Sequence, residues 1–231
     1  QIASIHEKRQ DFPAAQQAVA EAMAIEPTRP LELYSATLRA KSGDLEGAIA
    51  YLESLIEREP ENDELVYNLG VVYGEGKYRD EAISTMQRAL ELNPDNASAL
   101  NYIGYSWAEK GEKLDEAEEM ISRAIALRPE DGYIVDSLGW VYYMRAWPLV
   151  EAGRREEAEK YIEQAIEALT RADDLTGGDP VISEHLGDTY LLLDQRSRAL
   201  EKFREAVELG PREGEQPDLA EKLESLRREL E

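Results

Sequence analysis

The sequence predicts an all-α protein built from repeated pairs of helices. Three segments carry the same pattern, in which a glycine is followed three residues later by an aromatic residue, then by two alanines seven residues apart and a closing proline. They read VYNLGVVYGEGKYRDEAISTMQRALELNP, LNYIGYSWAEKGEKLDEAEEMISRAIALRP and SEHLGDTYLLLDQRSRALEKFREAVELGP. Gly70 and Gly104 lie 34 residues apart, and Gly104 and Gly139 lie 35 apart. A period of this length indicates stacked copies of one helical unit.

Small residues are expected where the two helices of a pair cross. They let the helices approach closely, from the eighth position of each first helix and from paired alanines on each second helix. The eighth positions are Ala36, Gly70, Gly104, Gly139 and Gly187, and the pairs are Ala82/Ala89, Ala117/Ala124, Ala165/Ala172 and Ala199/Ala206. The aromatic residues on the same helical face are expected to fill the space between repeats as core, and they are Tyr73, Trp107, Tyr142 and Tyr190.

Prolines mark the ends of the repeats, because proline lacks an N–H and has a fixed φ. They are Pro60, Pro94, Pro129 and Pro211. We expect a single array over residues 1–231, with repeats at about 1–28, 29–62, 63–96, 97–131, 132–179 and 180–213 and a capping helix at 214–231. The first repeat lacks its opening turn, which suggests a fragment of a longer chain. The cap is indicated by a helical stripe of leucines, Leu219, Leu223, Leu226 and Leu230.

One repeat is longer than the others. Gly139 and Gly187 lie 48 residues apart, which is 14 more than the usual 34. Seven residues added to each helix would lengthen the pair by two turns, or roughly 10 Å. We expect a projecting hairpin with its turn near Gly153, whose outer half contacts no neighbouring repeat and exposes Trp147 and Leu149. Because Pro148 disrupts helix interiors, a loop folded back over residues 144–158 is the alternative.

The whole pattern resembles the tetratricopeptide repeat, a helix-turn-helix unit of 34 residues. The resemblance covers essentially the whole chain and implies a right-handed superhelix of about six repeats. Residues 99 to 190 also resemble the carboxyl-terminal repeats of a family of exported bacterial tetratricopeptide proteins. Many of these are predicted outer-membrane lipoproteins, and one is an adaptor of a periplasmic carboxyl-terminal processing protease. This likeness implies a bacterial periplasmic protein, anchored through an upstream segment, with the cytoplasm as the alternative.

The composition argues against several classes of function. The chain has 49 acidic and 26 basic residues and a formal charge of −23, which opposes binding to nucleic acid phosphates. No stretch reaches the roughly 18 apolar residues that a membrane span needs. Cysteine is absent, which removes thiol nucleophiles and thiolate metal sites.

The sequence shows no catalytic pattern either. His6 and His185 are far apart in an extended array, and two imidazoles without cysteine make a poor zinc site. Although Glu184 and Asp188 lie near His185, we expect this histidine to be solvated on a helix surface. A phosphate-binding glycine loop and a nucleophile elbow are both missing from the sequence. We therefore expect no enzyme activity, no metal and no cofactor.

What remains is a surface on the first helix of each repeat. Positions 2, 5, 9 and 12 point away from the partner helix and line the concave side of a solenoid. Here they are rich in Trp and Tyr, which are enriched at binding hot spots. The candidate partner-binding residues are Tyr67, Asn101, Tyr105, Tyr133, Asp136, Trp140, Tyr143, Glu184 and Asp188, together with Trp147 and Leu149 of the hairpin. The alternative for Tyr133 and Tyr143 is burial between neighbouring helices as spacers.

The expected partner is a protein or peptide. Tetratricopeptide proteins that hold the acidic tails of chaperones present lysine and asparagine at positions 5 and 9, whereas this chain has Asp136 with Trp140 and Glu184 with Asp188 there. An acidic, aromatic groove favours apolar or basic segments. We therefore predict a non-catalytic scaffold or adaptor for such a segment. A structural scaffold that assembles from copies of itself is the alternative.

Overall fold

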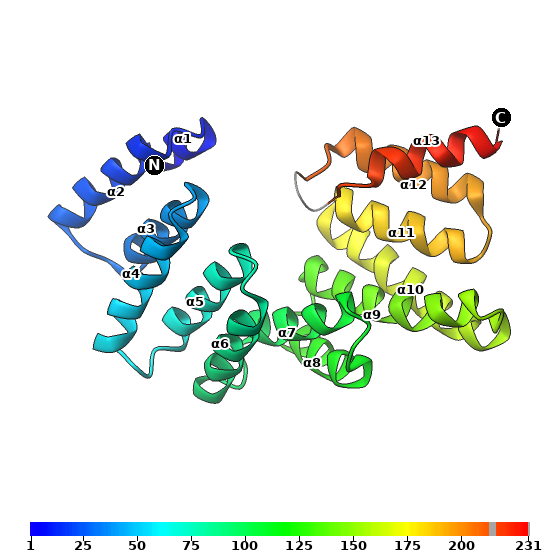
Figure 1. Ribbon diagram of the computed structural model, residues 1–231, viewed down its shortest axis with the longest axis horizontal. Coiled ribbons are helices and arrows are strands. Elements are labelled where there is room, and N and C mark those ends of the chain that lie inside the picture. The colour runs from blue at the N-terminus through cyan, green and yellow to red at the C-terminus, as the bar shows by residue number, and fades with distance from the viewer. Residues whose placement is uncertain (213–215, 231) are drawn as a thin grey trace. The chain divides into compact units, whose positions relative to one another are not determined.

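The computed structural model describes residues 1–212 and 216–230, and every regular element within these ranges is a helix (Figure 1). The all-α fold expected from the sequence is confirmed. The helices are α1 (Ile2–Lys8), α2 (Phe12–Ile25), α3 (Arg29–Lys41), α4 (Leu45–Arg58), α5 (Asp63–Glu75), α6 (Arg79–Leu92), α7 (Ala97–Glu109), α8 (Leu114–Leu127), α9 (Gly132–Glu151), α10 (Arg155–Thr176), α11 (Pro180–Leu192), α12 (Arg196–Leu209) and α13 (Leu219–Leu230).

The helices form two compact units, residues 1–99 and 100–231. In the first unit α1 packs on α2, α3 on α4 and α5 on α6, and successive pairs meet through α2 with α3 and α4 with α5. In the second unit α9 pairs with α10 and α11 with α12, while α8 packs on α9 and α10 on α11. Helix α13 lies beside α12 at the end of this unit (Figure 1). Contacts between sequence neighbours are typical of repeat arrays.

Short polar side chains begin many of the helices. The Asp44 carboxylate accepts a hydrogen bond from the Gly47 N–H at 3.0 Å, and the Asp179 carboxylate accepts one from the Val181 N–H at 2.9 Å. Such caps satisfy N–H groups that have no partner within the helix. The expected prolines stand two residues beyond the ends of α4, α6, α8 and α12. Local sequence signals therefore account for the ends of α4, α6, α8 and α12 and for the starts of α4 and α11.

The crossing points of the helix pairs hold the small residues that the sequence predicts. The eight alanines of the four pairs are completely buried, and the glycine or alanine at each eighth position is buried as well. A Cβ atom added to Gly187 would lie 2.4 Å from a ring carbon of Phe203. One added to Gly139 would lie 2.6 Å from Cγ of Leu169. A larger side chain at either glycine would push the paired helices apart.

The four aromatic residues expected in the core divide into two groups. Tyr142 and Tyr190 are buried, as the pattern predicts. Burial, and a 2.8 Å hydrogen bond to the carboxylate of Glu118, raise the pKa of the Tyr142 hydroxyl to about 12. Tyr73 and Trp107 are only half-buried, and the ammonium group of Lys113 lies 4.6 Å from the centre of the Trp107 ring. For these two the expectation of a core position is wrong, because each keeps part of its ring at the surface.

Residues 144–158 continue the helices of a long hairpin and do not fold back as a loop. Helix α9 has 20 residues and α10 has 22, whereas the other full repeats have first helices of 13 and second helices of 14. The turn contains Gly153 at φ +72°, a backbone conformation that favours glycine. Pro148 lies inside α9 without ending it. The helix continues through Glu151, so the proline is the first of its last four residues.

The outer half of this hairpin does contact its neighbours, contrary to the expectation from the sequence. The Arg155 side chain donates a hydrogen bond to the backbone carbonyl of Leu192 on α11 at 3.4 Å. At the base, the Arg145 guanidinium pairs with the Asp115 carboxylate of α8 at 2.7 Å. Leu149, expected to be exposed, is partly buried against an apolar cluster that includes Leu192. Neighbouring helices therefore brace the hairpin on both sides.

The carboxyl-terminal helix caps the second unit, as expected. Leu219 and Leu226 are buried and Leu223 is partly buried in a cluster that includes Phe203. Leu230, the last member of the expected stripe, is instead 44% exposed, because it lies at the final position of α13. The expected boundary between residues 213 and 214, and the expected end of the cap at residue 231, lie outside the described residues.

Replacing Gly187 with alanine tests the helix crossing. Alanine gains up to about 1 kcal/mol in helix propensity, but overlap with the buried Phe203 ring costs typically about 1–3 kcal/mol. We expect a net loss of about 1 kcal/mol in the free energy of unfolding, measured by urea denaturation followed by circular dichroism. In a Phe203→Leu background, which makes room for the methyl group, the same substitution should cost less. An equal loss in both backgrounds would contradict this account of the crossing.

Candidate functional site

The candidate partner-binding residues occupy both units. Tyr67 is half-buried on α5 in the first unit. The others belong to the second unit, where Asn101 and Tyr105 lie half-buried on α7. Helices α9 and α11 provide the rest, in the order Tyr133, Asp136, Trp140, Tyr143, Trp147 and Leu149 on α9, and Glu184 and Asp188 on α11.

Three rings stack in the second unit. The Trp140 ring lies 4.6 Å from the Tyr143 ring with 14° between their planes, and 4.2 Å from the His185 ring with 25° between their planes. These contacts cover ring surface of Trp140, which is half-buried overall. Burial also raises the pKa of the Tyr143 hydroxyl, and the nearby Asp188 adds to the effect. The stack holds Trp140 and Tyr143 in fixed orientations, with part of each side chain at the surface.

His185 is buried, so the expectation that it is solvated is wrong. Its Nδ1 atom lies 2.8 Å from Oδ1 of Asp136, and both residues are 7% exposed. Burial alone would lower the pKa of His185, but Asp136, with smaller effects from Asp188 and Glu184, outweighs it and raises the pKa. One feature of the sequence could have indicated this contact. Asp136 on one first helix and His185 on the next stand at nearly the same position of the repeat.

Glu184 and Asp188 are paired within the chain. The Lys222 ammonium of α13 lies 2.7 Å from Oε1 of Glu184 and 2.7 Å from Oδ2 of Asp188. Gln216 donates a further hydrogen bond to Glu184 at 2.8 Å. Burial raises the pKa of Asp188 more than Lys222 lowers it. The expected acidic surface is therefore largely internal, because the cap supplies the cation that was expected from a partner.

Two aromatic residues of the second unit remain well exposed. Tyr133 is 53% exposed at the start of α9, and the guanidinium of Arg212 lies 5.5 Å from the centre of its ring. Trp147 is 46% exposed near the end of the same helix. Two atoms at outward positions, Nε1 of Trp140 and Oδ1 of Asn101, are buried without a hydrogen-bond partner among the described residues. Whether these side chains bind a partner stays a prediction.

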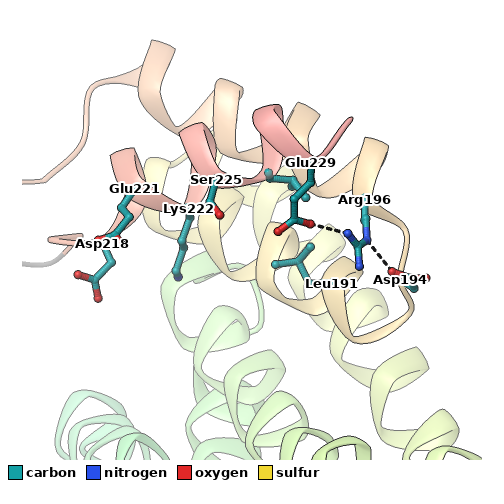
Figure 2. Close-up of a pocket in the computed structure, with 9 residues that line it drawn as sticks. Leu191, Asp194, Arg196, Asp218, Glu221, Lys222, Ser225 and Glu229 are labelled. Atoms are coloured by element: carbon teal, nitrogen blue, oxygen red, sulfur yellow. Dashed lines mark hydrogen bonds and ion pairs between the residues drawn. The ribbon is translucent and has the colours of Figure 1, made fainter. Parts of the chain in front are cut away.

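A cleft of about 670 Å³ lies between α13 and the junction of α11 with α12 (Figure 2). Arg196 on one side pairs with Asp194 at 2.8 Å and also with Glu229 on α13. Lys222 lines the cleft as well, but its ammonium is engaged by Glu184 and Asp188. The cations of this cleft are therefore already paired, which does not suit an anionic ligand.

Within residues 1–212 and 216–230, no cluster of three or more His, Asp or Glu side chains is arranged to hold a metal ion. In the same ranges, no helix combines the length and apolar character needed to cross a membrane.

Comparison with solved structures shows the same fold. MamA from Desulfovibrio magneticus RS-1 has 22% identity, covers 78% of this chain and 93% of its own, and superposes with a TM-score of 0.59. TTC0263, a thermophilic TPR protein in Thermus thermophilus, has 17% identity, covers 87% of this chain and 100% of its own, and gives a TM-score of 0.65. At these identities the likeness concerns the fold alone.

Sequence comparison identifies the family. The human PEX5-related protein is 35% identical over 75 residues, which are 32% of this chain and 12% of that protein. The chain thus aligns with about an eighth of this curated relative. Two models described as tetratricopeptide repeat match, one over residues 39–101 and the other over residues 73–132 and 143–214. Because the second model alone matches more than half of the chain, the protein belongs to the tetratricopeptide repeat family.

Proposed function

We propose that this chain is a non-catalytic scaffold that binds a protein or peptide segment on one face of its second unit. This aromatic face consists of Tyr105 on α7 and of Tyr133, Trp140 and Tyr143 on α9. The family supports a scaffold role, since tetratricopeptide repeat proteins are generally non-catalytic and the fold is consistent with protein–protein interaction. The stacking of Trp140 between helices α9 and α11 is the observation that carries the proposal.

Rigid aromatic side chains are effective binding residues. An immobilised side chain loses little conformational entropy on association, and Trp and Tyr dominate binding hot spots. The stack with His185 and the His185–Asp136 hydrogen bond restrain Trp140 before any partner arrives. Helix pairing does not need these residues, since Gly139 and the buried alanines form the crossing with α10. Their conformation is thus better suited to recognition than to packing alone.

The polar groups beside the aromatic face indicate the kind of segment that fits. Asp136, Glu184 and Asp188 face two basic groups, His185 and Lys222, so most of their charge is neutralised within the chain. The face itself then suits apolar side chains. The formal charge of −23 over the whole chain still attracts basic residues at longer range. We therefore propose a segment with apolar contact residues and basic flanks.

Two narrower alternatives follow from other observations. An exported bacterial protein that is anchored to the outer membrane and serves a periplasmic processing protease is supported by the resemblance of residues 99 to 190. A scaffold assembled from copies of this chain is supported by the exposed aromatic residue Trp147. Repulsion between two chains that each carry −23 opposes the second alternative at low salt.

Substitution of Tyr105 and Tyr133 by alanine tests the aromatic face. A peptide ligand is first selected on the full chain from a displayed library of random segments, and its affinity is then measured by calorimetry. We expect the double variant to bind this peptide about 10- to 100-fold more weakly, a typical loss for hot-spot residues. Tyr78→Ala, at a tyrosine of the first unit whose exposure is similar to that of Tyr133, serves as the control. Unchanged affinity in a folded double variant would exclude this face as the binding site.

The dependence of binding on salt tests the proposed basic flanks. Salt shortens the range of the acidic field, from about 10 Å at 0.1 M to about 3 Å at 1 M. We expect the association rate constant of the selected peptide to fall as salt rises, with little change in the dissociation rate constant. Stopped-flow fluorescence between about 0.05 and about 1 M salt measures both. An association rate constant that does not depend on salt would point to an uncharged ligand.

The buried histidine predicts how stability depends on pH. Because the pKa of His185 is raised above its ordinary value of 6.5, its contribution to stability is complete below about pH 6.5 and is lost as the pH rises through the raised value. The raised pKa of Asp188 acts in the same direction, since its ionised form is disfavoured in the folded chain. The groups facing His185 are Asp136, Glu184 and Asp188, with Lys222 beyond them.

We therefore expect the thermal midpoint to fall as the pH is raised from about 6 to 9, measured by circular dichroism. His185→Gln should remove most of this slope. His6→Gln is the matched control, since His6 is the other histidine of the chain and lies half-buried on α1 in the first unit. A slope that persists in the His185 variant would show that other groups cause it.

A further inference from the structure

The end of the long hairpin carries exposed side chains beyond the aromatic face. Trp147, Pro148 and Glu151 are all exposed, and positions 147, 148 and 151 share one face of α9. We call these three residues the hairpin tip. Leu149 and Val150, between them in sequence, turn inward and pack against a cluster that includes Ala146 and Ile162. The tip therefore lies on the exposed side of α9, whereas the opposite side of the same helix packs inside the hairpin.

The tip is held in place from both sides. The Arg155–Leu192 hydrogen bond joins α10 to α11, and the pairing of Arg145 with Asp115 joins α9 to α8. Trp147 therefore sits on a braced helix rather than on a loose loop. A braced aromatic residue with nearly half of its surface exposed can act as an anchor for a partner, since little order has to be created on binding.

The surroundings of Trp147 favour a positive charge. The last turn of α9 contains no basic residue and ends in Glu151, and a helix carboxyl-terminus carries a partial negative charge. The nearest basic residues in sequence after the helix are engaged, because Arg154 pairs with Glu157 at 2.6 Å and Arg155 bonds to a carbonyl. Glu151 lies four residues after Trp147, so both residues lie on the same side of the helix.

We propose that the hairpin tip binds an arginine or lysine side chain of a basic segment in a partner protein. The cation lies over the Trp147 ring and the Glu151 carboxylate lies beside it, which combines a cation–π contact with an ion pair. This inference rests on the proposed function in one respect, namely that the chain is a binding scaffold. A second copy of the chain is a poor occupant, because both copies carry a formal charge of −23.

The test uses the full chain and the peptide acetyl-RGRGRGRG-amide as the probe. Nuclear magnetic resonance follows the side-chain indole N–H signal of Trp147, identified by its loss in Trp147→Phe, as the peptide is added at low salt. We expect this signal to shift with saturation. Trp147→Ala and Glu151→Gln should each weaken peptide binding, measured by calorimetry, by about two- to fivefold, the range of an exposed cation–π contact or ion pair.

Glu163→Gln is the matched control, since it removes the same charge from an exposed position of α10 and should leave the affinity unchanged. Equal affinity in the folded Trp147, Glu151 and control variants would overturn the proposal. So would sedimentation showing that Trp147 mediates self-association. If the tip variants have no effect while the Tyr105 and Tyr133 variants lose their selected ligand, the inference fails and the proposed function stands. If the tip variants weaken binding while the Tyr105 and Tyr133 variants keep their affinity, the aromatic face is excluded and the inference about the tip stands.

Discussion

The close crossing of paired helices is the constraint on which the rest of the second unit depends. Gly139 meets Leu169 and Gly187 meets Phe203 at distances that leave no room for a methyl group. Since each glycine fixes the rotation of its helix, it also fixes which residues point away from the pair. Trp140 follows Gly139 directly and is turned about 100° away from it, toward His185 of the next first helix. The outward residues of the candidate site are therefore positioned by the buried residues of the helix crossing.

The buried polar groups of α9, α11 and α13 form a second set of contacts that stabilises the second unit. Three carboxylates on α9 and α11 would be costly to bury without partners, and His185 and Lys222 compensate two of the charges. Lys222 also ties the capping helix to α11 through polar contacts, in addition to the apolar contacts of Leu219 and Leu226. The cap and the aromatic face are thus linked, because Glu184 and Asp188 flank the histidine that stacks on Trp140. A change in the protonation of His185 or Asp188 therefore affects both the capping helix and the aromatic face.

Most of the fold could be predicted because its signals are local and repeated. Glycine, alanine and proline recur at fixed spacing, and seven extra residues per helix indicated the long hairpin. The partners of the buried charges were not predicted, because the contacts between Lys222 and Glu184 and between His185 and Asp136 join residues 38 and 49 positions apart. For His185 the only signal was its nearly equal register with Asp136 on the preceding first helix. Helical periodicity says that Glu184 points outward from its pair, but not that α13 covers it. The core positions predicted for Tyr73 and Trp107 were wrong for a similar reason, since the burial of a side chain depends on how neighbouring repeats pack.

The long hairpin and the aromatic face belong to one helix, and the phase of that helix relates them. Seven residues of an α-helix turn through about 700°, which is within about 20° of two full turns. Trp147 follows Trp140 by seven residues, so it lies on almost the same side of α9, roughly 10 Å further along. The added turns therefore extend the row formed by Tyr133, Trp140 and Tyr143 instead of starting a new surface elsewhere. A segment that contacts both Trp140 and Trp147 needs an apolar residue and a basic residue about three positions apart if the segment is extended, or about seven apart if it is helical.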